Sequence, residues 1–433
     1  MKRPPVTVID AVMGTGKSTW AIQRIKKDID RRTIVVLPYN DEVDRYANDL
    51  GSDLNVVALG EEYVDAKNSE TKTFAFVDAL KYADCIAITH SLFEGHINGE
   101  ILELIREGEW HIVIDETISV FQEKKGLDKQ DIQGFVEDGI ATVEVIDTGV
   151  SKLVLNAMMY DNYMELDRTT TKIGIVKLLR TRDFFMVDTE GAKDFYSFSM
   201  SPTWIDSFVS VMILTYLFKN SDMDYWLRIH SYTVEHLELL REGEGGPIVQ
   251  GHPGTYSGKS FRDLIAVERP GGRGKVYGDG FYDLSNTKMS RMSASSPAMV
   301  QIRQHLRGFK DRHGIANEDF MFTCRKDNRE DFIDRLRKLY KSFIGKQNWL
   351  AFNTRGTNKW KERHYIYYAV NLFPFPSIEK TIQRYGHDYD KEQFALSAML
   401  QFIWRSAIRE GEKITILFQS KRMGDLFEDW LNA

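Results

Sequence analysis

A hydrophobic run, a glycine-rich loop and an amphipathic segment follow one another near the start of the chain. The run VTVIDAV spans residues 6–12, GTGKST spans 14–19, and WAIQRIKKDI follows at 20–29 with apolar residues at helical spacing. This order predicts a buried strand, a tight loop and a helix whose first N–H groups can bind a polyphosphate. The residues that we expect to bind a nucleotide are Gly14, Thr15, Gly16, Lys17, Ser18 and Thr19.

Each part of this loop has a distinct chemical task. Glycine lets the backbone approach phosphate closely, Lys17 can reach the β- and γ-phosphates, and Ser18 can ligate Mg²⁺. The usual pattern begins with a further glycine, and Ala11 stands at that position here.

A second GKS at 258–260 has Pro253 at the same position and no long strand before it, so we interpret it as a surface loop.

A pair of adjacent carboxylates follows a second apolar run. The segment HIVIDETISV at 111–120 predicts a strand that ends at Asp115 and Glu116. Hydrolysis of a nucleoside triphosphate needs one carboxylate for the metal ion and one to polarise the attacking water. We therefore expect this strand to lie beside the first strand, with Asp115 serving Mg²⁺ and Glu116 the water.

These segments resemble conserved motifs of the superfamily 2 helicases, the DExx-box translocases built on two RecA-like domains. AVMGTGKST and DETI are similar to their motifs I and II. The segments TIVVLPYNDEVDRY (33–46) and CIAITHSLF (85–93) are similar to motifs Ia and Ib. The second similarity implies that Thr89 and His90 contact the nucleic-acid backbone.

A third strand with a polar end is predicted at 210–221, SVMILTYLFKNS. Its Leu-Thr-Tyr sequence resembles motif III, which couples hydrolysis to movement of nucleic acid in that family. The resemblance implies a coupling role for Thr215, although Tyr216 stands where the family usually has a small residue.

A polar stripe interrupts an apolar helix near the end of the chain. Gln401, Arg405 and Arg409 are spaced by four residues within an amphipathic segment predicted to run to Gly411, before a strand. Arginine on a packed helix is costly to bury unless it faces an anion. The stripe resembles motif VI, which implies that Arg405 or Arg409 acts in trans on the nucleotide. A solvated charged helix face is the alternative.

The second half of the chain carries a local basic stripe, although the whole chain has a net charge of −6. DFMFTCRK at 319–326 resembles motif IV, and the polar loop at 353–358 resembles the region of motifs IVa and V. The residues that this resemblance implies for nucleic-acid contact, with their neighbours, are Arg355, Thr357, Asn358, Lys359 and Trp360. A predicted helix at 301–313 adds Arg303, Arg307 and Lys310 on one face.

Taken together, these patterns predict an α/β protein with two RecA-like domains, each a parallel sheet flanked by helices. We expect the domains at 1–225 and 226–433, with an accessory lobe inserted at about 122–200. Two cysteines exclude a disulfide scaffold, and no apolar run is long enough for a membrane span, so a cytoplasmic protein without membrane contact is expected.

The expected function is an ATP-dependent nucleic-acid translocase or helicase that uses ATP and Mg²⁺. The C-terminal segments look most like helicase-like proteins of bacteriophages and prophages, which implies DNA rather than RNA as substrate and phage replication or recombination proteins as partners. Two alternatives stay open: a terminase-type DNA-packaging ATPase, and a non-translocating protein in which ATP switches an interaction.

Overall fold

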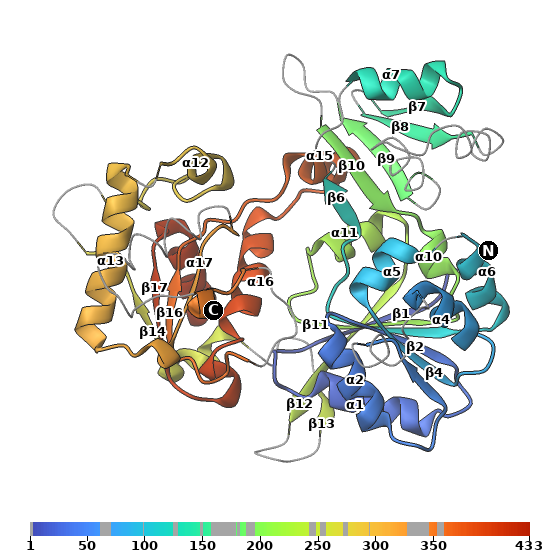
Figure 1. Ribbon diagram of the computed structural model, residues 1–433, viewed down its shortest axis with the longest axis horizontal. Coiled ribbons are helices and arrows are strands. Elements are labelled where there is room, and N and C mark those ends of the chain that lie inside the picture. The colour runs from blue at the N-terminus through green and yellow to red at the C-terminus, as the bar shows by residue number, and fades with distance from the viewer. Residues whose placement is uncertain are drawn as a thin grey trace. The chain divides into compact units, whose positions relative to one another are not determined.

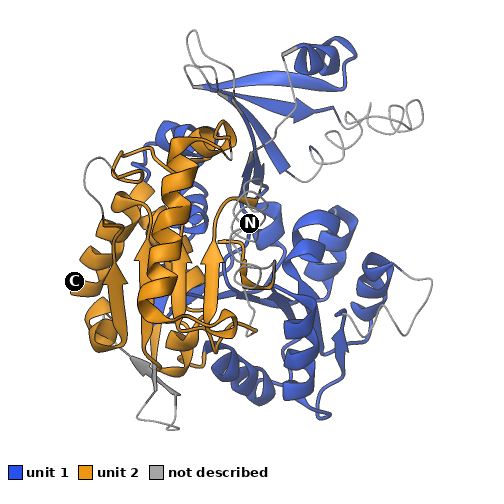
Figure 2. Cartoon of the chain, turned by 60° about the vertical axis from the view of Figure 1, so that its left-hand side comes forward, with its two compact units in different colours: residues 1–10, 17–237, 374–390 blue, residues 11–16, 238–373, 391–433 orange. Residues whose placement is uncertain are grey.

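A computed structural model describes most of the chain as two compact units (Figure 2). The described residues are 3–60, 71–97, 99–123, 129–147, 150–156, 179, 182–187, 195–241, 248–251, 257–271, 276–293, 295–326, 346–352 and 359–433. Unit 1 comprises Met1–Asp10, Lys17–Leu237 and Pro374–Asp390, and unit 2 comprises Ala11–Gly16, Glu238–Phe373 and Lys391–Ala433. Both are α/β structures with parallel sheets flanked by helices, which confirms the predicted fold class.

Unit 1 is built on a parallel sheet with the strand order β12-β1-β11-β5-β2-β4-β3 (Figure 1). The strands are β1 (Val6–Asp10), β2 (Thr33–Leu37), β3 (Val56–Ala58), β4 (Cys85–Thr89), β5 (His111–Asp115), β11 (Val211–Thr215) and β12 (Val234–Arg241). The second half of β12 belongs to unit 2 and pairs antiparallel with β13 (Ile248–Gly251). β2 and β4 are wholly buried, as expected of parallel strands covered on both faces.

Helices connect these strands, and the polar residues at the carboxyl ends of the strands lie at one edge of the sheet. The helices of unit 1 outside its lobe are α1 (Lys17–Lys27), α2 (Asn40–Leu50), α4 (Lys72–Ala79), α5 (His90–His96), α6 (Gly99–Glu107), α10 (Thr203–Asp206), α11 (Asp222–Ile229) and α15 (Pro376–Arg384). Parallel strands all end at the same edge, so the residues that follow β1, β4, β5 and β11 gather there.

The segment predicted as an insertion contains a five-stranded antiparallel sheet with the order β6-β10-β9-β8-β7. Its elements are β6 (Phe121–Glu123), α7 (Lys129–Glu137), β7 (Ala141–Asp147), β8 (Val150–Leu155), β9 (Arg182–Val187) and β10 (Phe195–Met200). Phe184 and Phe198 pack with α7 residues Ile132 and Phe135 in its core. Helix α15 packs on β6, β9 and β10.

Unit 2 is built on a four-stranded parallel sheet with the order β14-β17-β16-β15. Its strands are β14 (Ile265–Glu268), β15 (Phe320–Thr323), β16 (Tyr365–Tyr368) and β17 (Ile414–Phe418). Its helices are α12 (Asn286–Ser290), α13 (Pro297–His313), α16 (Lys391–Ile403) and α17 (Lys421–Asn432), with 3-10 turns at Gly258–Leu264, Asn317–Asp319, Lys346–Asn348 and Ala407–Glu410. The Ser296 hydroxyl caps α13 and left-handed Gly314 ends it, so local sequence sets both ends.

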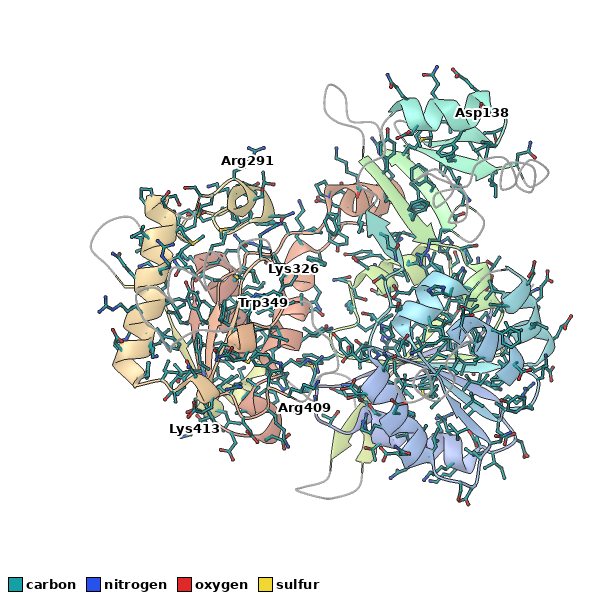
Figure 3. The ribbon with its side chains drawn as sticks, in the orientation of Figure 1. Asp138, Arg291, Lys326, Trp349, Arg409 and Lys413 are labelled. Atoms are coloured by element: carbon teal, nitrogen blue, oxygen red, sulfur yellow. The ribbon has the colours of Figure 1, made fainter. Side chains whose placement is uncertain are left out.

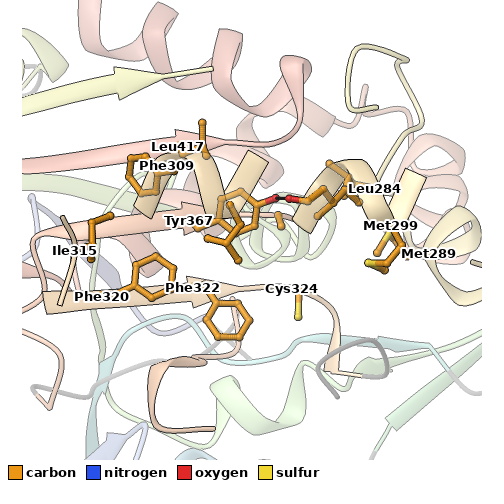
Figure 4. Close-up of a cluster of buried hydrophobic side chains, with 13 residues drawn as sticks. Leu284, Met289, Met299, Phe309, Ile315, Phe320, Phe322, Cys324, Tyr367 and Leu417 are labelled. Carbon is orange, nitrogen blue, oxygen red and sulfur yellow. Dashed lines mark hydrogen bonds between the residues drawn. The ribbon is translucent and has the colours of Figure 1, made fainter. Parts of the chain in front are cut away.

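One cluster of buried side chains in unit 2 lies between its sheet and α13 (Figure 4). Phe320 and Phe322 of β15 and Tyr367 of β16 contribute rings, and α13 contributes aliphatic side chains. Near Trp349 the structure has a 3-10 turn and a single parallel bridge to Phe322. Within the described part of the chain, no helix has the length and hydropathy needed to cross a membrane.

Candidate nucleotide-binding and catalytic site

The glycine-rich loop joins the end of β1 to the start of α1. Gly14 and Gly16 have φ values of 86° and 95°, in the left-handed region that a side chain disfavours, which explains glycine at both positions. The Thr15 hydroxyl donates a 2.9 Å hydrogen bond to the carbonyl of Val12 and closes the loop. The loop therefore has the compact backbone that a bound phosphate chain requires.

Ser18 and Asp115 are brought together across the carboxyl edge of the sheet. Ser18 Oγ, in the first turn of α1, donates a 2.7 Å hydrogen bond to Asp115 Oδ2 at the end of β5. Lys17 begins the same helix and is buried, with 7% of its surface exposed. The prediction that β5 lies directly beside β1 is wrong, because β11 lies between the two strands and pairs with both.

Burial in the sheet edge controls the charge of Asp115. Desolvation raises the pKa of its carboxyl to about 6, and the adjacent charge of Glu116 adds to the rise, while the Ser18 hydrogen bond and Lys17 oppose it. A carboxylate with such a pKa lacks sufficient positive charge around it. A divalent cation at this position would supply that charge.

Glu116 is held in an unusual conformation beside Thr215. Its φ is 63°, which is strained for a residue other than glycine, asparagine or aspartate, and its N–H donates to the Leu214 carbonyl at 2.8 Å. The Thr215 hydroxyl, at the end of β11, donates to Glu116 Oε2 at 3.4 Å. The structure thus places Thr215, at the end of β11, beside the carboxylate of Glu116.

Asp10, the last residue of β1, is a site residue that the sequence reasoning missed. Its two carboxylate oxygens accept the N–H groups of Leu217 and Phe218 at 2.8 and 2.9 Å. Leu217 and Asn220 both have positive φ, so Asp10 stabilises a strained loop after β11. The available signal was a lone acidic residue within an apolar strand, directly before the glycine-rich loop.

Thr89 and His90 lie at the carboxyl end of β4, but their side chains are buried. Thr89 Oγ1 caps α5 by accepting the N–H of Leu92, and the His90 ring nitrogen Nε2 lies 2.9 Å from the carbonyl of Asp115. This buried position of the ring disagrees with the prediction that the His90 side chain contacts nucleic acid. The ring turns inward because α5 starts directly at the strand end.

A cavity of about 620 Å³ opens at the carboxyl ends of β2 and β4. Its lining includes Thr89 and five residues that the sequence analysis did not identify: Tyr39, Asn40, Lys72, Ser91 and His96. Lys72 Nζ donates to Asn40 Oδ1 at 2.9 Å, which links the first turns of α4 and α2. Two helix N-termini, hydroxyl groups and one lysine make this lining suitable for a phosphate group.

The arginine segment is not one continuous helix, so the expected stripe is wrong in its geometry. Helix α16 ends at Ile403, and a separate 3-10 turn, Ala407–Glu410, ends at left-handed Gly411. The Ser406 hydroxyl bonds to the Ile403 carbonyl at 2.6 Å, and the Ala407 N–H donates to the Arg363 carbonyl instead of continuing the helix.

The three stripe residues therefore lie in three different settings. Gln401 is half-buried on α16, and Arg405 is buried in the turn that follows. Arg409, labelled in Figure 3, is half-buried on the 3-10 turn. The buried ring of Trp404 packs edge-on against Phe261 and Trp430, which fixes this turn.

The predicted nucleic-acid contacts of the second half are only partly described. Lys359 is exposed, and Trp360 is half-buried with the Arg363 guanidinium 5.5 Å from its ring centre. Arg355, Thr357 and Asn358 lie outside the described residues. On α13, Arg303 is buried, so the predicted basic face of this helix is not continuous.

Comparison with known proteins gives one family match and one relative of similar length. Residues 259–431 match the family described as the YonV C-terminal Rossmann-like domain. The chain is 26% identical over 444 residues to the SPbeta prophage-derived uncharacterized protein YonV of Bacillus subtilis (strain 168), with 98% of each chain covered.

Two solved structures align with this chain at low sequence identity. S. tokodaii Xpd4 aligns with a TM-score of 0.48 and 11% identity over 98% of this chain and 94% of that one. The DUF1998 helicase MrfA bound to DNA and AMPPNP aligns with a TM-score of 0.41 and 9% identity over 99% of this chain and 48% of that one. We base the functional proposal on the geometry of the site.

Proposed function

We propose that this protein hydrolyses ATP with Mg²⁺ and uses the reaction to move along nucleic acid. The observation that carries the proposal is the 2.7 Å hydrogen bond from Ser18 to Asp115, next to Lys17 and Glu116. In P-loop hydrolases, two protein groups hold Mg²⁺: the hydroxyl of a serine or threonine at the start of the phosphate-binding helix, and the carboxylate of an aspartate at a strand end.

The described residues fit these cofactors. Ser18 and Asp115 would hold Mg²⁺, which supplies charge neutralisation at the phosphates. The backbone of Gly14–Thr19 would bind the phosphates together with Lys17.

Within this scheme, Glu116 accepts a hydrogen bond from the attacking water and orients it, and Thr215 holds the carboxylate in place. We propose Gln401, Arg405 and Arg409 as contacts to the γ-phosphate on the basis of the resemblance of their segment to motif VI, although the three residues do not share one helix face. Whether Arg405 or Arg409 provides the main charge is decided by comparing the two alanine variants.

We propose the cavity above β2 and β4 as a contact to the nucleic-acid backbone. Lys72 and Ser91, beside the first turns of α2 and α4, offer a cation and a hydroxyl at one place. In this proposal Ser91 and Lys72 take the contact role first given to His90. We keep Thr89 as a proposed contact to the nucleic-acid backbone. The proposed contacts of the second unit remain Arg355, Thr357, Asn358, Lys359 and Trp360.

DNA is the proposed substrate, in a phage replication or recombination context, because a prophage-derived relative matches the whole chain. The test is steady-state ATP hydrolysis by wild type and by Glu116→Gln, with single-stranded, duplex and forked DNA and with RNA. Glu107→Gln, at an exposed position of α6, is the matched control. We expect stimulation by DNA that is lost in Glu116→Gln and kept in the control.

Each outcome of this test assigns a different function. Hydrolysis that no nucleic acid stimulates would reject the translocase and favour an ATP-switched binding protein. Stimulation by RNA alone would reject DNA as substrate. Absence of hydrolysis in wild type with Mg²⁺ would reject the enzyme itself.

A further inference from the structure

The carboxyl edge of the sheet in unit 2 carries two adjacent exposed aromatic side chains. Phe281 and Tyr282 are 57% and 59% exposed, and both contact Phe373 with ring-centre distances of 5.6 and 5.5 Å. The guanidinium of Arg422 lies 5.5 Å from the centre of the Phe281 ring and 4.5 Å from that of Phe373. Adjacent exposed rings form an apolar patch of the kind that marks interaction sites on protein surfaces.

The turn that carries these rings is rigidly built. The Asp283 carboxylate accepts the N–H groups of Gly278 and Gly280 at 3.2 and 3.0 Å and pairs with Lys288 at 2.8 Å. A side chain at Gly278 would collide with the Gln419 carbonyl, and Leu284 has a φ of 62°. Strain of this kind persists only where the surroundings determine the conformation.

Asn371 fixes the same turn from the segment that follows β16. Its Nδ2 donates to the carbonyls of Phe281 and Asp283 at 2.9 and 2.8 Å, and Arg422 holds its Oδ1 at 2.9 Å. The N–H of Lys421 donates to the Gly278 carbonyl at 2.8 Å. The rings are therefore presented in a fixed arrangement, so a ligand that stacks on them would lose little affinity to ordering of the turn.

Positive charge surrounds the rings. Helix α17 starts here with Lys421 and Arg422 in its first turn, where Lys421 pairs with Asp425 at 2.5 Å and Arg422 donates to Asn371 and to the Leu372 carbonyl at 2.9 Å. The basic residues that follow the strands of unit 2 or flank the turn are Arg325 and Lys326 after β15, Lys288 and Arg291 at α12, and Lys421 and Arg422, of which Figure 3 labels Arg291 and Lys326. The acids include Asp279, Asp283, Asp425 and Glu392, with Asp283 paired to Lys288 and Asp425 to Lys421, so the basic side chains outnumber the acidic ones.

From these observations we infer that Phe281, Tyr282 and Phe373 form a stacking platform for the bases of single-stranded nucleic acid. The inference rests on the proposed function and names a binding site within it. Aromatic faces accept any base, and basic residues beside them bind the backbone phosphates, so the platform is a sequence-tolerant contact. Its place at the carboxyl ends of parallel strands is where open α/β sheets bind their ligands.

The test is fluorescence anisotropy with labelled oligo(dT) and oligo(rU) of about 20 nucleotides, measured over a series of salt concentrations. We expect the Phe281→Ala/Tyr282→Ala double variant to bind the better ligand about 100-fold more weakly, since each of the two stacked rings contributes on the order of tenfold. The salt dependence of its affinity should match wild type, because no phosphate contact is removed. Phe281→Trp/Tyr282→Trp should restore binding.

Tyr82→Ala removes an equally exposed ring from unit 1, 54% exposed, and serves as the control. ATP hydrolysis without nucleic acid should be unchanged in every variant, which excludes misfolding. Photo-crosslinking to an oligonucleotide with 5-iodouracil, mapped by mass spectrometry, should label the peptide around 281–282.

Wild-type affinity in the double variant would overturn the platform while leaving the proposed function intact, and would assign these rings to a protein partner. Crosslinks found only elsewhere would overturn it as well. Failure of wild type to bind either oligonucleotide would reject both the platform and the nucleic-acid part of the proposed function.

Discussion

The hydroxyl of Thr215 lies 3.4 Å from Oε2 of Glu116, so the end of β11 touches the carboxylate proposed to orient water. Thr215→Val keeps the shape of the side chain and removes this hydrogen bond. We expect kcat to fall about five- to tenfold, in line with about 1 kcal/mol for one hydrogen bond, with the KM for ATP little changed. Steady-state kinetics measures both constants.

Thr142→Val, on the exposed face of β7, is the control for the Thr215 variant. If Thr215→Val raised KM and left kcat at the wild-type value, the hydroxyl would act in nucleotide binding rather than in positioning Glu116.

Asp10 links the end of β1 to the loop after β11. Asp10→Ala leaves the N–H groups of Leu217 and Phe218 without their acceptor, which should cost about 2–4 kcal/mol in the free energy of unfolding. Asp10→Asn keeps one acceptor oxygen and should cost roughly half of that. Urea denaturation monitored by circular dichroism measures the difference. An Asp10→Ala variant as stable as Asp53→Ala, at an exposed site, would contradict this role.

Local chemistry made much of this site predictable. A phosphate-binding loop depends on its own glycines and on the helix that follows, and β-branched runs form parallel strands, so Gly14–Thr19, Asp115 and Thr215 are found from short segments. Their gathering at one edge follows from parallel strands alone. Which strands are neighbours does not follow, and β11 lies between β1 and β5.

What the sequence did not predict depends on contacts between distant segments. The partners of Asp10 are more than 200 residues away, and nothing near Asp10 in the sequence identifies them. The helix predicted to reach Gly411 ends at Ile403 because the Ala407 N–H finds the Arg363 carbonyl. Periodicity alone cannot detect such a competing hydrogen bond.

The pKa of Asp115 predicts how stability depends on pH. Its folded pKa of about 6 lies above the unfolded value near 4, so between these pH values the native state binds more protons than the unfolded state. The free energy of unfolding contributed by Asp115 should therefore be highest below pH 4 and fall by about 2–3 kcal/mol as pH rises to 7.

Urea denaturation gives the free energy of unfolding of wild type and of Asp115→Asn at each pH. The difference between the two isolates the contribution of Asp115. A difference that is flat from pH 4 to pH 7 would contradict the buried position of the carboxylate. Addition of Mg²⁺ and a non-hydrolysable ATP analogue should recover the lost stability at pH 7 in wild type only, since binding to the native state adds to stability.

His90 and Ser91 are neighbours in the sequence, and the structure predicts opposite effects for them. The His90 ring donates to the Asp115 carbonyl from a buried position, so His90→Ala should lower kcat for basal hydrolysis about tenfold and leave the Kd for DNA within about twofold of wild type. Ser91 is exposed and lines the cavity at β4, so Ser91→Asp should weaken DNA binding about tenfold by charge repulsion and leave basal hydrolysis intact. Kinetics and anisotropy on both variants give the comparison, and the reverse pattern would restore His90 as the nucleic-acid contact.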